Sequence, residues 1–347
     1  MPRYAREIAP AVLAMSALRE RMLADLDLKQ GGIGWWSEHL GDPRRMLVGD
    51  YLIGLTDSTE TNLVEAVMHL HQAKEGWYAA GTETTASTLA GRPRYPLSDR
   101  GRDREVENQA HAAGFFRAVG SVLDNLAGIV IGAAGLAKDI VLADLKHLLS
   151  GNSVGLIGEE GAGRTAQMAL VSVLRDQIDA APDGWFAWVD GTRNTLVHRA
   201  RRVVWEVDDR SRGDGVFRPL ARDPDQTAAE AMARTPRDGA GREYLDEHAL
   251  DTMAGTLQVV LSSTRAVAIE AGKLWDARRA NPSLIVQPVA QWPRIARGKV
   301  TGFAGFDPGA GSRITVAALM LNPRLWRRMQ AARLDDGRHG QWANWLE

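Results

Sequence analysis

The run Arg193-Asn194-Thr195-Leu196-Val197-His198 holds residues whose types and spacing could do chemistry together. In a helix, positions four apart share a face, so Asn194 and His198 lie one turn apart on one side. Arg193 directly precedes Asn194, and its long side chain can reach the same edge. The run therefore brings an imidazole, a guanidinium and an amide within reach of one another.

These three groups suit the cleavage of a phosphodiester bond. An imidazole titrates near neutral pH and can move a proton to or from a ribose 2′-hydroxyl or a leaving oxygen. A guanidinium binds phosphate and stabilises the charge of the transition state. An amide can position the phosphate or hold the imidazole. This chemistry requires neither a metal nor a cofactor, so the sequence predicts none.

Two further sets of residues belong to the predicted site. Arg199, Arg201 and Arg202 follow the run, either as a basic edge for an RNA substrate or as a solvated helix face. Asp124 and Asn125 interrupt an apolar stretch. A buried carboxylate is costly unless it is paired. Asp124 is therefore expected either to pair with a residue of the motif helix, such as Arg193, or to stay partly exposed at a helix bend.

The elements that must position these residues are mostly helical. Apolar residues recur at helical spacing through much of the chain. The pattern predicts helices over residues 5–29, 61–78, 103–136, 140–149, 164–178, from 185 through the run, and 246–279.

Strand-like segments are fewer. The β-branched and aromatic runs in 203–221 predict an inserted β-hairpin, and further such runs follow Pro282. Residues 81–102 lack periodicity and are expected to be a linker. We therefore predict an N-terminal helical region and linker (1–102), a helical bundle (103–280) and a C-terminal β-hairpin with a short helix (281–347).

The run at 193–198 resembles the signature of the HEPN superfamily, an Arg, usually followed by a polar residue, with a His a few residues later. The resemblance covers roughly residues 105–278, with the hairpin as an insertion. It implies a compact helical bundle that acts as a homodimer, with Arg and His of both chains lining one cleft. It also implies a metal-independent endoribonuclease whose catalytic set is Arg193, Asn194 and His198.

The same resemblance implies RNA as substrate and a toxin–antitoxin or antiviral defence context, with an antitoxin or defence-system partner. HEPN members also include inactive proteins. The alternative function is therefore a catalytically inactive HEPN-like scaffold, or a protein that binds RNA or another partner.

The amino-acid composition excludes several other classes of function. The chain has 347 residues, of which 45% are hydrophobic, enough for a substantial core. Its 42 basic and 43 acidic residues give no global electrostatic attraction to nucleic acid. It has no cysteine, which excludes disulfides, thiolate metal sites and cysteine nucleophiles. The first residues do not have the pattern of a signal peptide, so a cytoplasmic location is expected.

Three segments suggest other functions, and each has a simpler interpretation. Residues 118–137 are apolar enough to span a membrane, but Asp124 near mid-span would cost about 2.5–3.5 kcal/mol, which favours a core helix. Residues 158–165 spell a P-loop with Arg for Lys, but Glu159 and Glu160 would repel phosphate, which favours an interhelical loop. His69 and His71 face apart on a helix, which predicts no metal site.

Overall fold

The computed structural model describes residues 5–27, 32–33, 44–89, 99–150, 160–198, 205–208, 216–219 and 249–284. This part of the chain is mainly α, as the sequence predicted. The helices are α1 (Ala5–Ala24), α3 (Arg44–Leu89), α4 (Asp99–Ala134), α5 (Leu145–Leu149), α6 (Ala162–Asp179), α7 (Trp185–His198) and α9 (Ala249–Ala280), followed by a 3-10 turn, η2 (Pro282–Leu284). The short strands β1 (Leu26–Asp27) and β2 (Gly32–Ile33) pair antiparallel.

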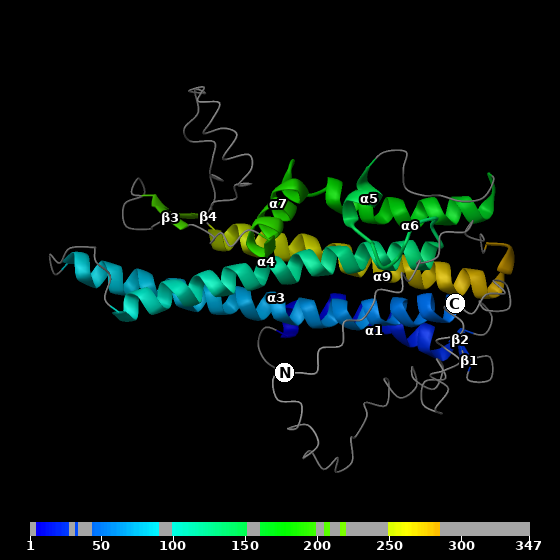
Figure 1. Ribbon diagram of the computed structural model, residues 1–347, viewed down its shortest axis with the longest axis horizontal. Coiled ribbons are helices and arrows are strands. Elements are labelled where there is room, and N and C mark those ends of the chain that lie inside the picture. Colours follow the sequence, from blue (N-terminus) through cyan, green and yellow to red (C-terminus); the bar gives the residue numbers. More distant parts are fainter. Residues whose placement is uncertain are drawn as a thin grey trace, which may run out of the picture.

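The long helices lie side by side along the molecule. Figure 1 shows α3 and α4 following the long axis, with α1 against α3 and with α9 next to α4. The shorter helices α5, α6 and α7 cover the outer side of α4 and α9. Helix α7, which ends at His198, the last residue of the 193–198 run, therefore packs against α4.

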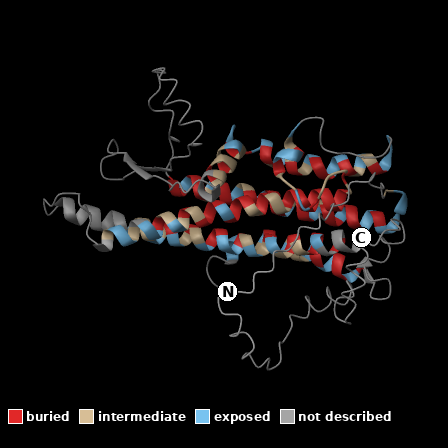
Figure 2. Cartoon of the chain, viewed as in Figure 1, coloured by how far each residue is buried: buried red, intermediate tan, exposed pale blue. Residues whose placement is uncertain are grey.

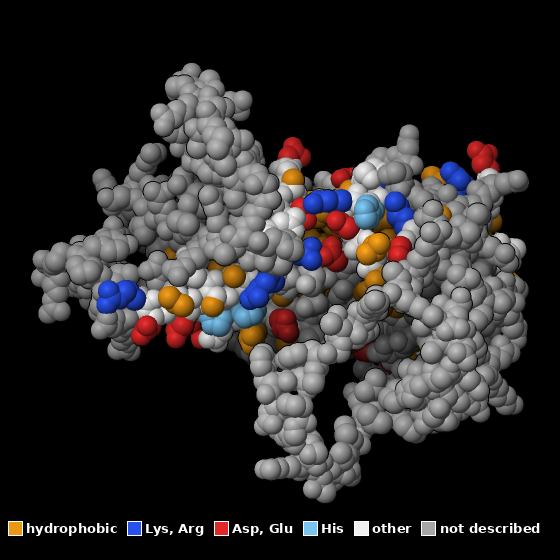
Figure 3. All heavy atoms as spheres, viewed as in Figure 1, with side chains coloured by type: hydrophobic (Ala, Val, Ile, Leu, Met, Phe, Trp, Pro, Cys, Tyr) orange, Lys and Arg blue, Asp and Glu red, His pale blue; other side chains and the backbone are white. Residues whose placement is uncertain are grey.

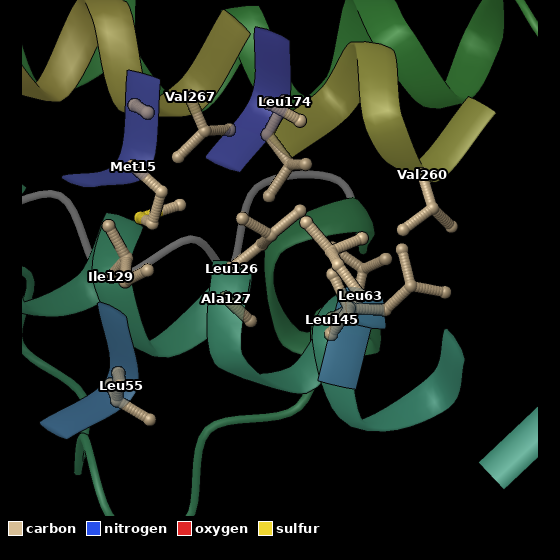
Figure 4. Packing of buried hydrophobic residues seen from close by; sticks show 14 of the residues in the cluster. Met15, Leu55, Leu63, Leu126, Ala127, Ile129, Leu145, Leu174, Val260 and Val267 are labelled. Carbon is tan, nitrogen blue, oxygen red and sulfur yellow. The ribbon is translucent and has the colours of Figure 1, made fainter. Parts of the chain in front are cut away.

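One hydrophobic core joins these helices. Buried residues recur along most of α4 and α9 (Figure 2). Met15 of α1, Leu63 of α3, Ile129 of α4 and Val260 of α9 belong to this core and lie at different points along it (Figure 4). Each such side chain contributes about 1.5–3 kcal/mol when fully removed from water. The predicted division at residue 102 therefore crosses one continuous core.

The apolar part of α4 is a core helix. It is the one helix among the described residues that is long and apolar enough to cross a membrane, and 78% of that window is buried inside the bundle. Gly128 and Gly132 bring its neighbours close. A Cβ on Gly128 would lie 2.5 Å from Leu55 Cδ1, and one on Gly132 would lie 2.7 Å from Ile140 Cδ1. The two glycines therefore let side chains of the neighbouring elements lie directly against the backbone of α4.

The carboxyl end of α4 is capped by side chains from two other helices. Arg278 of α9 donates to the carbonyl oxygens of Ala133 and, at 2.8 Å, Ala134. Gln167 of α6 donates to Ala134 O at 3.0 Å and to Gly135 O at 3.1 Å. Burial lowers the pKa of Arg278 to about 10. Because the last carbonyls of a helix lack partners within it, these two side chains fix α6 and α9 to the end of α4.

Two sequence predictions about the first half of the chain need correction. The helix expected over 61–78 is much longer, since α3 spans Arg44–Leu89. The expected linker 81–102 is wrong over most of its length, because α3 continues to Leu89 and α4 begins at Asp99. Once a packed helix exists, extending it by a residue costs little, so weakly helical residues can continue it.

The remaining predicted elements differ in outcome. The predictions for α4, α6, α7 and α9 are confirmed within a few residues. The helix expected over 5–29 ends at Ala24 and is followed by β1, and the helix expected over 140–149 is only α5. The strands β3 (Trp205–Asp208) and β4 (Val216–Pro219) pair antiparallel. The turn between them lies outside the described residues, and so does the chain beyond residue 284. The inserted hairpin and the C-terminal β region therefore stay predictions.

Candidate functional site

Helix α7 is fixed to the bundle by aromatic side chains on its inner face. Trp185 and Val189 are buried, and the Trp185 indole nitrogen donates to Thr256 Oγ1 of α9 at 3.2 Å. Trp188 packs edge-on against Phe116 of α4, with ring centroids 5.4 Å apart. These contacts hold the face of α7 that carries Trp185 and Val189 against the bundle.

Arg193 lies one helical turn after Val189 and pairs with α4. Its Nη2 is 2.6 Å from Asp124 Oδ2, and the two side chains are 28% and 27% exposed. Gly120, one turn before Asp124, leaves room for the stem of the arginine, since a Cβ there would lie 2.2 Å from Arg193 Cδ. Of the two expectations for Asp124, the structure shows the pair with Arg193.

Asn194 and two further residues extend the same polar group. The Asn194 amide donates to Asp190 Oδ2 at 3.1 Å, one turn earlier on α7. The same Asp190 oxygen is 2.6 Å from Lys146 Nζ of α5, whose side chain is 51% exposed. Asp144 caps α5 by accepting from the Lys146 backbone N–H at 2.8 Å. We call Asp124, Asp144, Lys146, Asp190, Arg193 and Asn194 the charged cluster.

Figure 3 shows acidic and basic side chains interspersed over α5 and α7, where this cluster lies. Burial raises the pKa of Asp124, Arg193 opposes that shift, and Asp144 and Asp190 add to it. The hydrogen bond to Asp190 raises the pKa of Lys146, against a smaller opposing effect of burial. The cluster is thus an alternating set of acids and bases in which the guanidinium and the ammonium ion are each held by a carboxylate.

The other predicted site residues are placed less completely. His198 is the last residue of α7, and the helical period puts it on the same face as Asn194. Its side chain lies outside the described part of the chain, as do Arg199, Arg201 and Arg202. The Asn125 amide nitrogen is buried and has no hydrogen-bond partner among the described residues. Asn125 therefore neighbours the cluster in sequence without a contact that joins it.

Sequence reasoning missed Asp144, Lys146 and Asp190. Asp190 could have been found, because it precedes Asn194 by one helical turn. Lys146 and Asp144 reach the site from a short helix more than forty residues earlier. No local pattern connects that helix to α7, so only the packing of the bundle brings them together.

His69 and His71 are close in sequence, but their side chains face different helices. His71 faces α1, with its Nε2 3.6 Å from Glu7 Oε2. His69 faces α4 instead, with its Nδ1 3.0 Å from His111 Nδ1. The prediction that His69 and His71 point apart is confirmed. Within the described residues, no group of three or more His, Asp or Glu side chains is arranged to hold a metal ion.

The histidine pair predicts a loss of stability in mild acid. Burial, His111 and Arg117 lower the pKa of His69, and Glu65 opposes them. The unfolded chain therefore binds more protons than the folded one just below about pH 6.5, so the free energy of unfolding decreases as the pH falls through that window. We expect urea denaturation of the wild type to show this loss between about pH 7 and about pH 5.5.

In His69→Gln the loss should be smaller, because the titrating group is gone. His147→Gln is the control, since His147 is an exposed histidine on α5. Equal losses in the wild type and His69→Gln would contradict the prediction.

Comparison with known proteins identifies no relative of this chain. The chain matches no protein-family model, and no curated protein or solved structure is significantly similar to it. These comparisons neither support nor contradict the resemblance of the 193–198 run to HEPN proteins.

Proposed function

We propose that this protein is a metal-independent endoribonuclease that acts as a homodimer, with Arg193, Asn194 and His198 as its catalytic set. One observation carries the proposal: Arg193 and Asn194 lie side by side on α7, each held by a carboxylate in a partly exposed cluster. Side chains oriented in this way meet a phosphate without a large loss of conformational freedom. The spacing of α7 puts His198 one turn further along the same face.

The proposed reaction is an internal transfer within RNA. His198 takes the proton of a ribose 2′-hydroxyl, and the 2′-oxygen attacks the adjacent phosphorus. The bond to the 5′-oxygen breaks, and that oxygen leaves with a proton. The products are a 2′,3′-cyclic phosphate and a 5′-hydroxyl. Because one histidine donates while another accepts, a dimer that joins two copies of α7 would supply both.

The arginine would stabilise the reaction electrostatically. The Arg193 guanidinium has five N–H donors, and its Nη2 lies 2.6 Å from Asp124 Oδ2. Donors that do not face Asp124 can contact the phosphate, whose negative charge increases in the transition state. Arg199, Arg201 and Arg202 would extend the basic edge along the RNA backbone.

The wider setting of the proposal rests on the HEPN resemblance. In this proposal the protein acts in the cytoplasm, away from membranes, as part of a toxin–antitoxin or antiviral defence system with a cognate partner. In the same proposal the hairpin at 203–221 is an insertion in the bundle, and residues 281–347 add a small β-containing region.

The experiment is RNA cleavage by the purified full chain in excess EDTA. We expect the wild type to cleave, with a 2′,3′-cyclic phosphate on the product, and Arg193→Ala/His198→Ala to be inactive while still folded. Cleavage that EDTA abolishes, or that the double variant retains, would refute the proposal.

A second candidate is a non-catalytic HEPN-like scaffold that binds RNA or a protein. The intrachain ion pair of Arg193 with Asp124 favours it, because this arginine already has a structural partner. A folded wild-type dimer that binds RNA in a filter assay but leaves it intact would support this second function over the first.

A further inference from the structure

Two histidines from different helices meet at the side of the α3–α4 pair. His69 Nδ1 and His111 Nδ1 lie 3.0 Å apart, although the residues are 42 positions apart in sequence. The ring centroids are 5.3 Å apart, and the planes are inclined by 50°. Both side chains are partly buried, so the helices hold the two rings while part of each residue stays exposed. Figure 3 shows histidine side chains beside acidic and basic ones over these helices.

The separation of the two nitrogens fits two ligands of one metal ion. Zinc–imidazole bonds are about 2.0–2.1 Å long, which puts two neighbouring ligand nitrogens about 2.9–3.4 Å apart in tetrahedral or square geometry. We propose that His69 and His111 form a chelating site for a divalent transition metal with affinity for imidazole, such as Zn²⁺ or Cu²⁺. The ion takes the place of the proton that the two nitrogens share in its absence.

The electrostatic surroundings favour the metal-binding form of the pair. A histidine binds metal through its neutral imidazole, and burial lowers the pKa of His69 toward that form. Glu65, one turn before His69 on α3, supplies negative charge, whereas Arg117 on α4 opposes a cation. Since no third described ligand is arranged at the pair, the remaining coordination positions are filled by water.

Gly114 makes this arrangement possible. It is buried on α4, and a Cβ at this position would lie 2.4 Å from His69 Nε2 and 2.6 Å from its Cε1. The ring of His69 therefore rests directly against the backbone of α4, which aims its Nδ1 at His111. Gly114→Ala would keep both imidazoles in the chain and displace one of them.

This site is separate from the charged cluster. His111 and Asp124 are thirteen positions apart on α4, a distance of about 20 Å at the helical rise. The proposal does not depend on the ribonuclease function. A bound ion would link the middle of α3 to α4, and we expect it to stabilise the pairing of these two helices.

The test is calorimetric titration of the full chain with ZnCl₂ at neutral pH. We expect one ion per chain, and about 100-fold weaker binding in His69→Gln and in His111→Gln, because each change removes one arm of the chelate. Gly114→Ala should weaken binding as well. His71→Gln and His147→Gln should bind as the wild type does, and MgCl₂ should give no binding.

A second measurement identifies the ligands even where a variant is poorly folded. The electron paramagnetic resonance spectrum of the wild type with one equivalent of Cu²⁺ should show coupling to two imidazole nitrogens. Circular dichroism establishes which variants are folded. The proposal would be overturned if folded His69→Gln and His111→Gln bound zinc as tightly as the wild type does. It would also be overturned if the copper spectrum of the wild type showed no coupling to two imidazole nitrogens and were the same in His71→Gln.

Discussion

Replacing Arg19 by methionine is expected to lower the free energy of unfolding by about 3–5 kcal/mol, while Arg21→Met costs about 1 kcal/mol or less. Both arginines lie on α1 and both pair with carboxylates. They differ in burial, because the Arg19 side chain is 1% exposed and that of Arg21 is 45% exposed. The comparison isolates burial from charge and side-chain length.

The contacts of Arg19 give the reason for the large effect. Its Nη1 is 2.7 Å from Asp57 and 2.6 Å from Glu60 on α3, and its Nη2 donates to Ser16 at 2.8 Å. Methionine fills similar space but removes the buried cation that faces Asp57 and Glu60, so the attraction that offsets the burial of the guanidinium site and the partial burial of these carboxylates is lost. Arg21 meets Asp276 at 3.1 Å in water, where the charges are screened.

Urea denaturation of the two variants beside the wild type measures both losses. A midpoint shift without a change in slope identifies a change in stability rather than in compactness. Equal losses in the two variants would show that burial of the Arg19 pair has no special role in joining α1 to α3.

The helices that were predicted well are those whose apolar residues recur regularly at helical spacing. The sequence of α9 repeats buried residues such as Leu257, Val260 and Val267 on one face, so both its type and its extent could be predicted. Helix α3 extends well beyond the predicted 61–78, and no local pattern in the sequence indicates its long contact with α4. Propensity is a weak guide when tertiary contacts decide.

The residues of the candidate site also differ in whether the sequence could predict them. The residues of the site that lie on α7 could be predicted, because helical spacing alone puts Asn194 and His198 on one face. The ion pair of Asp124 with Arg193 is one of the two arrangements that the sequence allowed. The free-energy cost of burying a carboxylate indicates that Asp124 needs a partner, but it does not show which residue that partner is. Lys146 could not be predicted, because its contact with Asp190 depends on how α5 turns back after α4.

Replacing His198 by alanine is expected to lower the rate of RNA cleavage by about 10²–10⁴-fold, which is the contribution of a positioned proton-transfer group. Arg193→Lys should lower it by about 10²-fold, because lysine keeps a cation near Asp124 but loses the planar fork that fits a phosphate. His147→Ala removes an exposed histidine of α5 and should leave the rate unchanged. Single-turnover cleavage of a labelled RNA in EDTA measures all three rates.

The order of the three rates separates the catalytic role from a structural one. Arg193 is tied to Asp124, so a variant at 193 changes both the site and the contact between α7 and α4. If Arg193 acts only through that contact, lysine preserves the ion pair and with it the rate of cleavage. If it binds the phosphate, lysine preserves the thermal stability but not the rate. A stable Arg193→Lys with full activity would therefore remove Arg193 from the catalytic set, whatever the outcome for His198.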